Sequence, residues 1–167
     1  MKKLVYLAGH ISPDPATFEW RRRAHNLLKP WFTVINPMTN LWNLRLKDRF
    51  KLNEIWEFET TALAESQNLL IHKDFQNVSS SHIMLANLSI DAERPYIGTL
   101  FELDWCWMLR KPVVAIISKT SWYSIHPFIN STISAKVSSV EEGCDMVKAF
   151  FTEKEEREPS KIKTDAG

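Results

Sequence analysis

The chain has 167 residues and a formal net charge of +1, with 21 Lys and Arg against 20 Asp and Glu. This length is typical of one domain with its own core, and 44% hydrophobic with 25% charged residues excludes a disordered protein. The balanced charge argues against a nucleic-acid or membrane partner. Cys106 and Cys144 lack metal-ligand spacing, and the first apolar run is too short for a signal sequence or membrane span. We therefore expect a cytoplasmic protein with reduced thiols.

Short apolar runs alternate with helical patterns along the chain. In chain order they predict a strand at 3–8, a helix at 15–29, a strand at 31–35, a long loop at 38–51, a helix at 52–71, a short helix or turn at 74–81, a strand at 82–88, a loop at 89–97, a helix at 98–110, strands at 113–117 and 135–137, and a helix from 139 to about 151; residues 121–134 are ambiguous. The alternation predicts an α/β fold, a flavodoxin- or Rossmann-like doubly wound sheet of about five mainly parallel strands flanked by helices. We expect a single domain at 1–152 and a charged tail at 153–167.

Polar loops follow several of the predicted strands. In an open parallel sheet, ligands bind beyond the carboxyl ends of the strands. If strands 3–8 and 82–88 are neighbours, Tyr6, Gly9, Asp91 and the beginning of the helix at Gly98 converge. We expect the functional site there.

Glu102 has two interpretations. The segment Thr99-Leu-Phe-Glu102 fits a capping box, in which Glu102 only bonds back to the backbone of Thr99. Alternatively, Glu102 lies on the first turn of the helix, where the helix dipole stabilises its carboxylate as a nucleophile toward an electrophilic carbon.

Three segments, in this order, resemble the nucleoside 2-deoxyribosyltransferase family. They are Val-Tyr-Leu-Ala-Gly at 5–9, Ile-Met-Leu-Ala-Asn-Leu at 83–88, and Gly-Thr-Leu-Phe-Glu-Leu at 98–103, which runs on to Lys-Pro-Val-Val at 111–114. The resemblance covers residues 4–114, whereas the long loop and the C-terminal third match poorly or not at all.

The resemblance implies that the protein moves 2-deoxyribose between nucleobases through a covalent intermediate on Glu102. A nearby carboxylic acid would protonate the departing base, and no metal or organic cofactor would be needed. The partners would be 2-deoxynucleosides and free nucleobases. Two alternatives stay open: a hydrolase of deoxynucleosides or their 5-monophosphates, with Ser79–Ser81 and Arg94 as possible phosphate donors, and a non-catalytic nucleotide-binding module.

The resemblance also implies roles for four further residues. Tyr6 would orient Glu102, Asp74 would contact the base or sugar, Gly9 would let the sugar approach the backbone, and Asn130 would reach the 5-hydroxyl in a neighbouring subunit. Each has a plainer interpretation as an ordinary strand, cap, turn or surface residue. Glu102, Asp74 and Tyr6 are thus the expected catalytic residues.

The sequence departs from the family pattern at three places. Tyr96 stands six positions before Glu102, where the family usually has an aspartate, so that proton delivery would fall to Asp91 if its loop folds over the site. His10 replaces a common proline and could contact substrate. The end of the chain at 163–167 lacks the aromatic finish of some members. His10, Asp91 and Tyr96, with Gly9, Gly98 and Asn130, form the expected substrate-binding set.

The remaining features have structural interpretations. We expect Arg21–Arg23 to be a solvated helix face, Cys106 to be an inert core thiol, and Trp105 and Trp107 to pack in the core or against another subunit. The helix from Gly98 is apolar nearly all round. It therefore predicts a homo-oligomer with active sites near the subunit interfaces.

Overall fold

The computed structural model describes residues 1–11, 15–39, 62–90 and 96–155. In this part of the chain five strands form one parallel sheet: β1 (Leu4–Gly9), β2 (Thr33–Ile35), β3 (Ile83–Asn87), β4 (Val113–Ile116) and β5 (Ala135–Val137). Their spatial order is β2-β1-β3-β4-β5, the order of flavodoxin-like sheets. The predicted fold class is confirmed.

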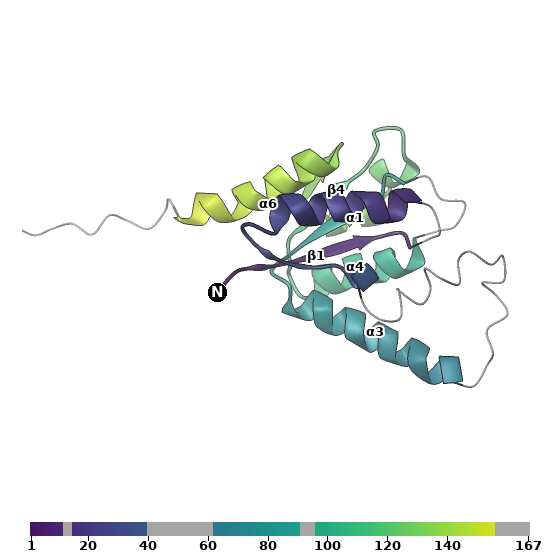
Figure 1. The fold of residues 1–167 in the computed structure, drawn as a ribbon. Helices are drawn as coiled ribbons and strands as arrows, with labels where there is room; N and C mark the ends of the chain where they lie inside the picture. The colour runs from purple at the N-terminus through teal and green to yellow at the C-terminus, as the bar shows by residue number, and fades with distance from the viewer. Residues whose placement is uncertain (12–14, 40–61, 91–95, 156–167) are drawn as a thin grey trace, which may run out of the picture.

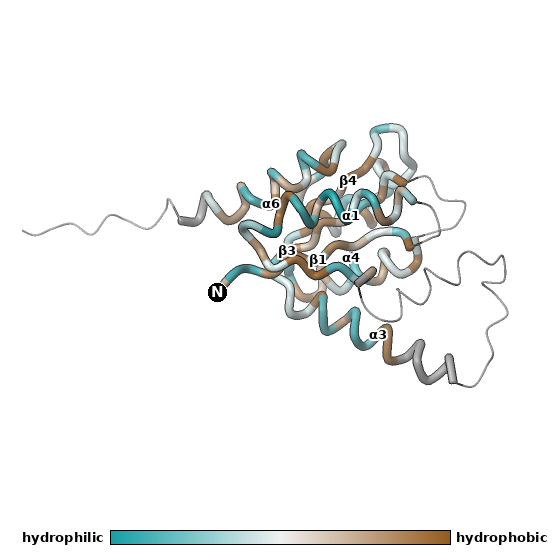
Figure 2. Tube along the Cα trace, in the orientation of Figure 1, coloured by the Kyte–Doolittle hydropathy of each residue, from teal (hydrophilic) through white to brown (hydrophobic). Residues whose placement is uncertain are grey.

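The three central strands are apolar along their whole length because helices cover both faces of the sheet. β1, β3 and β4 are almost entirely buried and appear in brown in the hydropathy trace (Figure 2). Along β1, Val5 and Leu7 pack on one side of the sheet, whereas Tyr6 and Ala8 pack on the other. This alternation directs the hydroxyl-bearing side chain of Tyr6 toward a single helical layer.

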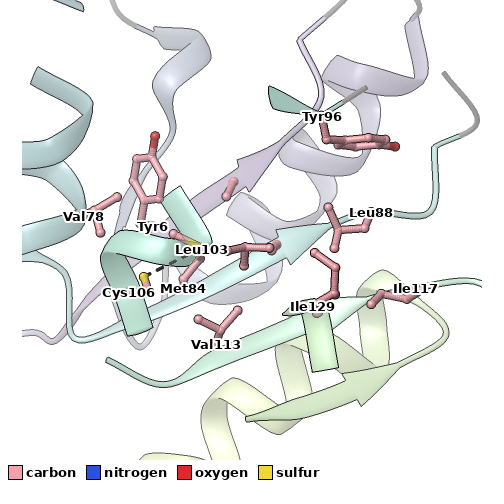
Figure 3. Packing of buried hydrophobic residues seen from close by; sticks show 13 residues of the cluster. Tyr6, Val78, Met84, Leu88, Tyr96, Leu103, Cys106, Val113, Ile117 and Ile129 are labelled. Atoms are coloured by element: carbon pink, nitrogen blue, oxygen red, sulfur yellow. Dashed lines mark hydrogen bonds between the residues drawn. The ribbon is translucent and has the colours of Figure 1, made fainter. Parts of the chain in front are cut away.

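The helices form two layers around the sheet (Figure 1). They are α1 (Pro15–Leu28), α3 (Ala62–Ser80), α4 (Ile97–Met108), α5 (Pro127–Thr132) and α6 (Val140–Glu155), with short 3-10 turns at η1 (Pro37–Thr39) and η2 (Trp122–Ser124). α1 and α6 pack on the Val5 side, and α3, α4 and α5 contribute to the Tyr6 side. Figure 3 shows the second layer, where Leu103 and Cys106 of α4 and Val78 of α3 surround Tyr6 and Met84.

Two helix boundaries differ from the prediction. α3 continues without a break to Ser80, because no Gly or Pro interrupts it, so the separate short helix or turn at 74–81 is wrong. α6 extends to Glu155, which places its end inside the predicted tail. The ambiguous segment at 121–134 holds η2 and α5. The loop at 40–51, the helix at 52–61 and the rest of the tail at 156–167 lie outside the described residues.

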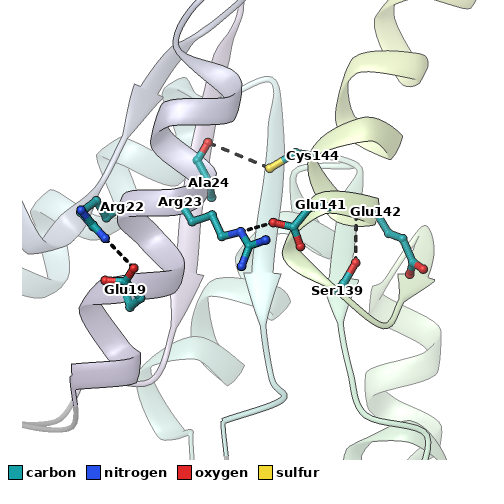
Figure 4. Close-up of polar contacts among 8 residues, drawn as sticks. All are labelled: Glu19, Arg22, Arg23, Ala24, Ser139, Glu141, Glu142 and Cys144. Atoms are coloured by element: carbon teal, nitrogen blue, oxygen red, sulfur yellow. Dashed lines mark hydrogen bonds and ion pairs between the residues drawn. The ribbon is translucent and has the colours of Figure 1, made fainter.

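The three consecutive arginines of α1 have different environments, so the prediction of one solvated face is wrong. Arg22 pairs with Glu19 at 2.6 Å, and Arg23 pairs with Glu141 of α6, both at the surface (Figure 4). Arg21, however, is only 1% exposed. It is buried because it belongs to a helical stripe that faces the sheet, together with Thr17, Ala24 and Leu28.

Both cysteines are buried and free. Burial raises the pKa of Cys106 to about 12, so it stays an uncharged thiol, which agrees with the predicted inert core residue. In the residues described here, no helix has the length and apolar character that crossing a bilayer requires.

Candidate active site

β1 and β3 are the neighbouring strands at which the connections of the sheet change direction. The chain leaves β1 toward β2 on one side and returns to β3 on the other, so the strand order reverses at this point. In open α/β sheets, ligands bind at such a switch point, beyond the carboxyl ends of the strands. Tyr6, which is in register with Met84 of β3, lies on these adjoining strands.

A short hydrogen bond joins β1 to α4 on the Tyr6 side of the sheet. The hydroxyl of Tyr6 donates to Oε1 of Glu102 over 2.5 Å. Glu102 is 8% exposed, so its carboxyl group is nearly removed from bulk water. The residue that the sequence singles out is therefore held by a second element of the fold.

The capping-box interpretation of Glu102 is wrong. α4 begins at Ile97 with Tyr96 as its N-cap, so that Thr99 already lies inside the helix. Glu102 is consequently in the second turn, and the expected first-turn position is wrong as well. Because the field of a helix end falls off within one turn, the dipole stabilises this carboxylate little.

Burial dominates the electrostatics of Glu102. It raises the pKa of the carboxyl to about 8, and the nearby charge of Asp74 acts in the same direction. The hydrogen bond from Tyr6 and the positive charge of Arg21 oppose this rise. At neutral pH the group therefore holds its proton in most molecules, yet loses it readily.

Asp74 lies on the α3 side of the same region. Its charge raises the pKa values of both Glu102 and Tyr6. Burial raises the pKa of Asp74 itself to about 6, against the charge of Lys73. Its Oδ1 atom is buried and has no hydrogen-bond partner among the described residues. The region therefore holds a second carboxyl, half-buried on α3, whose charge acts on the first.

Gly9 ends β1 in a conformation that favours glycine, with φ of 156°. A Cβ atom there would lie 2.9 Å from Cζ2 of Trp20 and 3.0 Å from the carbonyl oxygen of Asn87. The chain's own packing therefore already requires glycine at this position. A contact of Gly9 with the sugar stays a prediction.

His10 and Tyr96 lie together beside the end of β1. Their ring centroids are 5.2 Å apart, and Tyr96 also packs edge-on against Tyr123. Tyr96 is buried, and its hydroxyl donates to the carbonyl of Ile90. Tyr96 therefore connects the beginning of α4 to Ile90, which follows β3, and substrate contacts of His10 and Tyr96 stay predictions.

The other predicted residues are more dispersed. Gly98 is exposed, and a Cβ atom added there would have no other atom within 4 Å. It lies four residues before Glu102, on the same side of α4. Asn130 is exposed on α5, where its amide donates to the carbonyl of Ser124 at 3.4 Å. Asp91 and Arg94 lie outside the described residues.

The expected phosphate donors at 79–81 lie at the opposite edge of the sheet, because they directly precede β3. The hydroxyls of Ser80 and Ser81 donate to carbonyls of α3, at 2.8 and 2.7 Å. These contacts with α3 satisfy the two hydroxyls, whereas the buried Oγ of Ser79 has no hydrogen-bond partner among the described residues. Among the residues that the structure describes, no cluster of His, Cys, Asp and Glu could hold a metal ion.

Sequence reasoning missed Arg21. Its guanidinium donates to the carbonyl oxygen of Gly9 at 2.6 Å, and its charge acts on Glu102. A signal is present in the sequence, because Arg21 has helical spacing with the apolar residues Ala24 and Leu28 of the same helix. The adjacent Arg22 and Arg23 made the whole run of arginines resemble an exposed charged face.

Comparison with known proteins agrees with the fold. No protein-family model and no curated protein matches the chain. Among solved structures, a 2-deoxyribosyltransferase from Bacillus psychrosaccharolyticus superposes with a TM-score of 0.59 at 18% identity, covering 83% of this chain and 88% of its own. A conserved protein from Enterococcus faecalis V583 gives 0.58 at 17% identity, over 90% of this chain and 99% of its own.

A third structure has the same architecture. The CMP N-glycosidase BcmB from Clostridium botulinum superposes with a TM-score of 0.51 at 10% identity, covering 89% of this chain and 99% of its own. At such identities the likeness shows a shared fold. What the chain does must be argued from its own side chains.

Proposed function

We propose that the protein is an N-deoxyribosyltransferase, which exchanges the nucleobase of 2-deoxyribonucleosides through a covalent intermediate on Glu102. The observation that carries the proposal is the buried Glu102 carboxyl, held by the hydroxyl of Tyr6 on a strand next to the β1–β3 switch point, together with the half-buried Asp74, whose charge acts on it. The structural likeness to a 2-deoxyribosyltransferase supports the same conclusion.

In the first half of the reaction, ionised Glu102 attacks the anomeric carbon of the sugar. The bond from that carbon to the base nitrogen breaks as the bond to Oε forms, through an oxocarbenium-like state. The absent 2-hydroxyl leaves this developing cation less destabilised. Tyr6, which donates to Glu102, holds the carboxylate in one orientation during the attack.

Asp74 supplies the proton that the departing base requires. A group whose pKa is about 6 is basic enough to hold a proton in part near neutrality and acidic enough to release it. In the second half, the acceptor base attacks the same carbon, its proton passes to Asp74, and Glu102 is released. Two displacements of this kind predict ping-pong kinetics.

A hydrolase is the second candidate. Water in place of the acceptor base would use the same two carboxyls, and the likeness to a CMP N-glycosidase favours this alternative. A non-catalytic nucleotide-binding module is the third, in which Glu102 would stay protonated and only donate a hydrogen bond.

The site is also expected to lie near a subunit interface. Ile97, Phe101 and Met108, here called the α4 ridge, are apolar side chains on the helix that carries Glu102, and each is about 60% exposed. Water contact with such a patch is unfavourable, which supports a homo-oligomer. Asn130 on neighbouring α5 would then reach the site of another subunit.

One incubation separates these functions. Purified protein is mixed with deoxyinosine and free adenine, and the products are followed by chromatography. New deoxyadenosine supports transfer, free deoxyribose without it supports hydrolysis, and neither product supports a binding module.

The Glu102→Gln variant tests the nucleophile. A neutral amide fills the same space but cannot attack, so transfer should be lost while the fold is kept. Glu19→Gln, at an exposed carboxyl of α1, is the matched control. Transfer at the wild-type rate in Glu102→Gln would refute the assignment.

A further inference from the structure

Two ionisable side chains, Arg21 and Glu102, are buried among the described residues. They carry opposite charges when ionised and come from helices on opposite faces of the sheet. Burying a charge is unfavourable unless hydrogen bonds and an opposite charge compensate it. The buried guanidinium of Arg21 therefore requires compensating partners.

The guanidinium of Arg21 is bound by backbone oxygens. Nη2 donates to the carbonyl of Gly9 at 2.6 Å, and Nη1 donates to the carbonyls of His10 at 3.1 Å and Thr17 at 2.8 Å. Gly9 and His10 are the last residues of β1 and the first beyond it. One planar group therefore fixes the backbone at the carboxyl end of β1 to the first turn of α1.

These carbonyls neutralise none of the positive charge. Cζ of Arg21 lies 4.7 Å from the centroid of the Trp20 ring, which stabilises a cation but carries no net charge. Burial lowers the pKa of Arg21 to about 10, so the group stays charged at neutral pH. Glu102 is the carboxylate whose charge favours the charged form of Arg21.

We propose that Arg21 is a positioning residue of the Glu102 site, which fixes the carboxyl end of β1 and provides the positive charge that stabilises the Glu102 carboxylate. Its kinetic consequence rests on the proposed function. Its electrostatic consequence can be measured without substrate.

The groups that act on Glu102 come from three other elements. Tyr6 of β1 donates a hydrogen bond and Asp74 of α3 repels the carboxylate, whereas Cys106, on α4 itself, is an uncharged thiol. Arg21 of α1 is the cation that acts on Glu102 among the described residues. Removing it leaves the repulsion from Asp74 and the effect of burial opposed by Tyr6 alone.

The test compares Arg21→Gln and Arg21→Lys with the control Arg22→Gln. The glutamine is neutral but keeps an amide that can donate to the Gly9 carbonyl, and the lysine keeps the charge without the planar fork. Arg22 is exposed on the adjacent helix position and pairs with Glu19. Carboxyl resonances of ¹³C-glutamate-labelled protein, assigned with Glu102→Gln, give the titration midpoint of Glu102, and kcat/KM for deoxyinosine is measured against pH.

In Arg21→Gln the Glu102 midpoint should move to higher pH, and kcat/KM at neutral pH should fall about 10- to 100-fold, as misplacement of a site commonly does. Arg21→Lys should keep the midpoint near that of the wild type while kcat/KM still falls, and Arg22→Gln should change neither. An unchanged midpoint in folded Arg21→Gln would overturn the proposal, because a purely structural role would not be expected to change it.

Two further outcomes also test the proposed role of Arg21. If Arg21→Gln does not fold, Arg21→Lys with wild-type kcat/KM overturns the positioning role, and reduced kcat/KM at an unchanged midpoint supports it. If the wild type cleaves no nucleoside at any pH, the proposed function fails, and the midpoint in Arg21→Gln still tests the electrostatic part.

Discussion

The hydroxyl of Tyr6 lies 2.5 Å from Oε1 of Glu102 and connects two residues that are 96 positions apart in the chain. The bond joins β1 to α4, so the carboxyl of Glu102 keeps its orientation only while these two elements stay packed against each other. It also opposes the rise in the pKa of Glu102 that burial causes.

Tyr6→Phe should lower activity through the charge of Glu102. Without the donor, the pKa of Glu102 rises above about 8, and kcat/KM at pH 7 should fall about 10- to 100-fold, because a hydrogen bond to a charged group contributes about 1.5–3 kcal/mol. Part of the loss should be recovered at high pH. The measurement is the pH profile of kcat/KM, with Tyr123→Phe as the control. A loss of equal size at every pH would contradict this explanation.

The pH profile of kcat/KM of the wild type should be bell-shaped. Catalysis requires ionised Glu102 and protonated Asp74, whose pKa values are about 8 and about 6. Below the lower value both groups are protonated and no nucleophile exists, whereas above the higher value both are ionised and no acid exists. The two apparent pKa values belong to the pair. Asp74→Asn should remove the bell and Asp104→Asn, at an exposed carboxyl of α4, should keep it; a flat wild-type profile would argue against the pair.

The stability of the fold should decrease as Glu102 ionises. Its folded pKa, about 8, is above the ordinary value of 4.5, so the folded state favours the protonated form. This contribution is fully present below pH 4.5 and is lost as pH rises through about 8. Between pH 5 and pH 9, denaturant titration should show a loss on the order of 3–5 kcal/mol relative to Glu102→Gln. Parallel curves for the two proteins would show that the carboxyl is not buried.

Two glycines offer a contrast between site and core. A methyl group at Gly98 meets open space on the same side of α4 as Glu102, so Gly98→Ala should keep or raise the melting temperature while narrowing the approach to the carboxyl. We expect kcat/KM to fall. At Gly143 of α6 a Cβ would lie 2.8 Å from Cδ1 of Leu85, so Gly143→Ala should lower the melting temperature instead. Full activity in Gly98→Ala would remove Gly98 from the site.

The α4 ridge should mediate assembly. Phe101→Asp places a charge in the middle of an exposed apolar stripe, and light scattering should show dissociation of the oligomer to monomers. Trp31→Asp, at an exposed residue between α1 and β2, should not change the mass of the oligomer. A monomeric wild type would contradict the homo-oligomer and, with it, the action of Asn130 in a neighbouring subunit.

The layered α/β architecture could be predicted from the sequence because its signals are local. Apolar runs with β-branched residues define β1, β3 and β4, and the helical patterns between them require a parallel sheet. The sheet in turn defines the edge at which a ligand binds. Tyr6 and Glu102 were therefore within reach of sequence analysis, and the structure brings them into contact.

The environments of Asp74 and Arg21 could not be predicted from local sequence patterns. Residues 74–81 suggested a separate short helix or turn, yet residues 74–80 continue α3, so that the charge of Asp74 acts on Glu102 from a long helix. Arg21 is buried and Arg22 is exposed, because the helical twist turns adjacent side chains to different sides. The order of residues alone did not reveal which arginine of the three would face the sheet.

The capping-box spacing, Ser or Thr followed three residues later by Glu, occurs near the beginning of both α4 and α6, and the two glutamates have different environments. Ser139 and Glu142 form a helix cap, in which the Glu142 amide donates to Oγ of Ser139 at 3.1 Å and the Glu142 carboxylate accepts from the amide of Ser138 at 2.9 Å. Thr99 and Glu102 have the same spacing, but α4 begins earlier and Glu102 bonds to Tyr6 of β1. The sequence determined the strands, the helical segments and the presence of both carboxylates. Only tertiary packing decided which of them caps its own helix and which becomes a buried acid, because burial and a distant hydroxyl, neither of which is local, set the environment of Glu102.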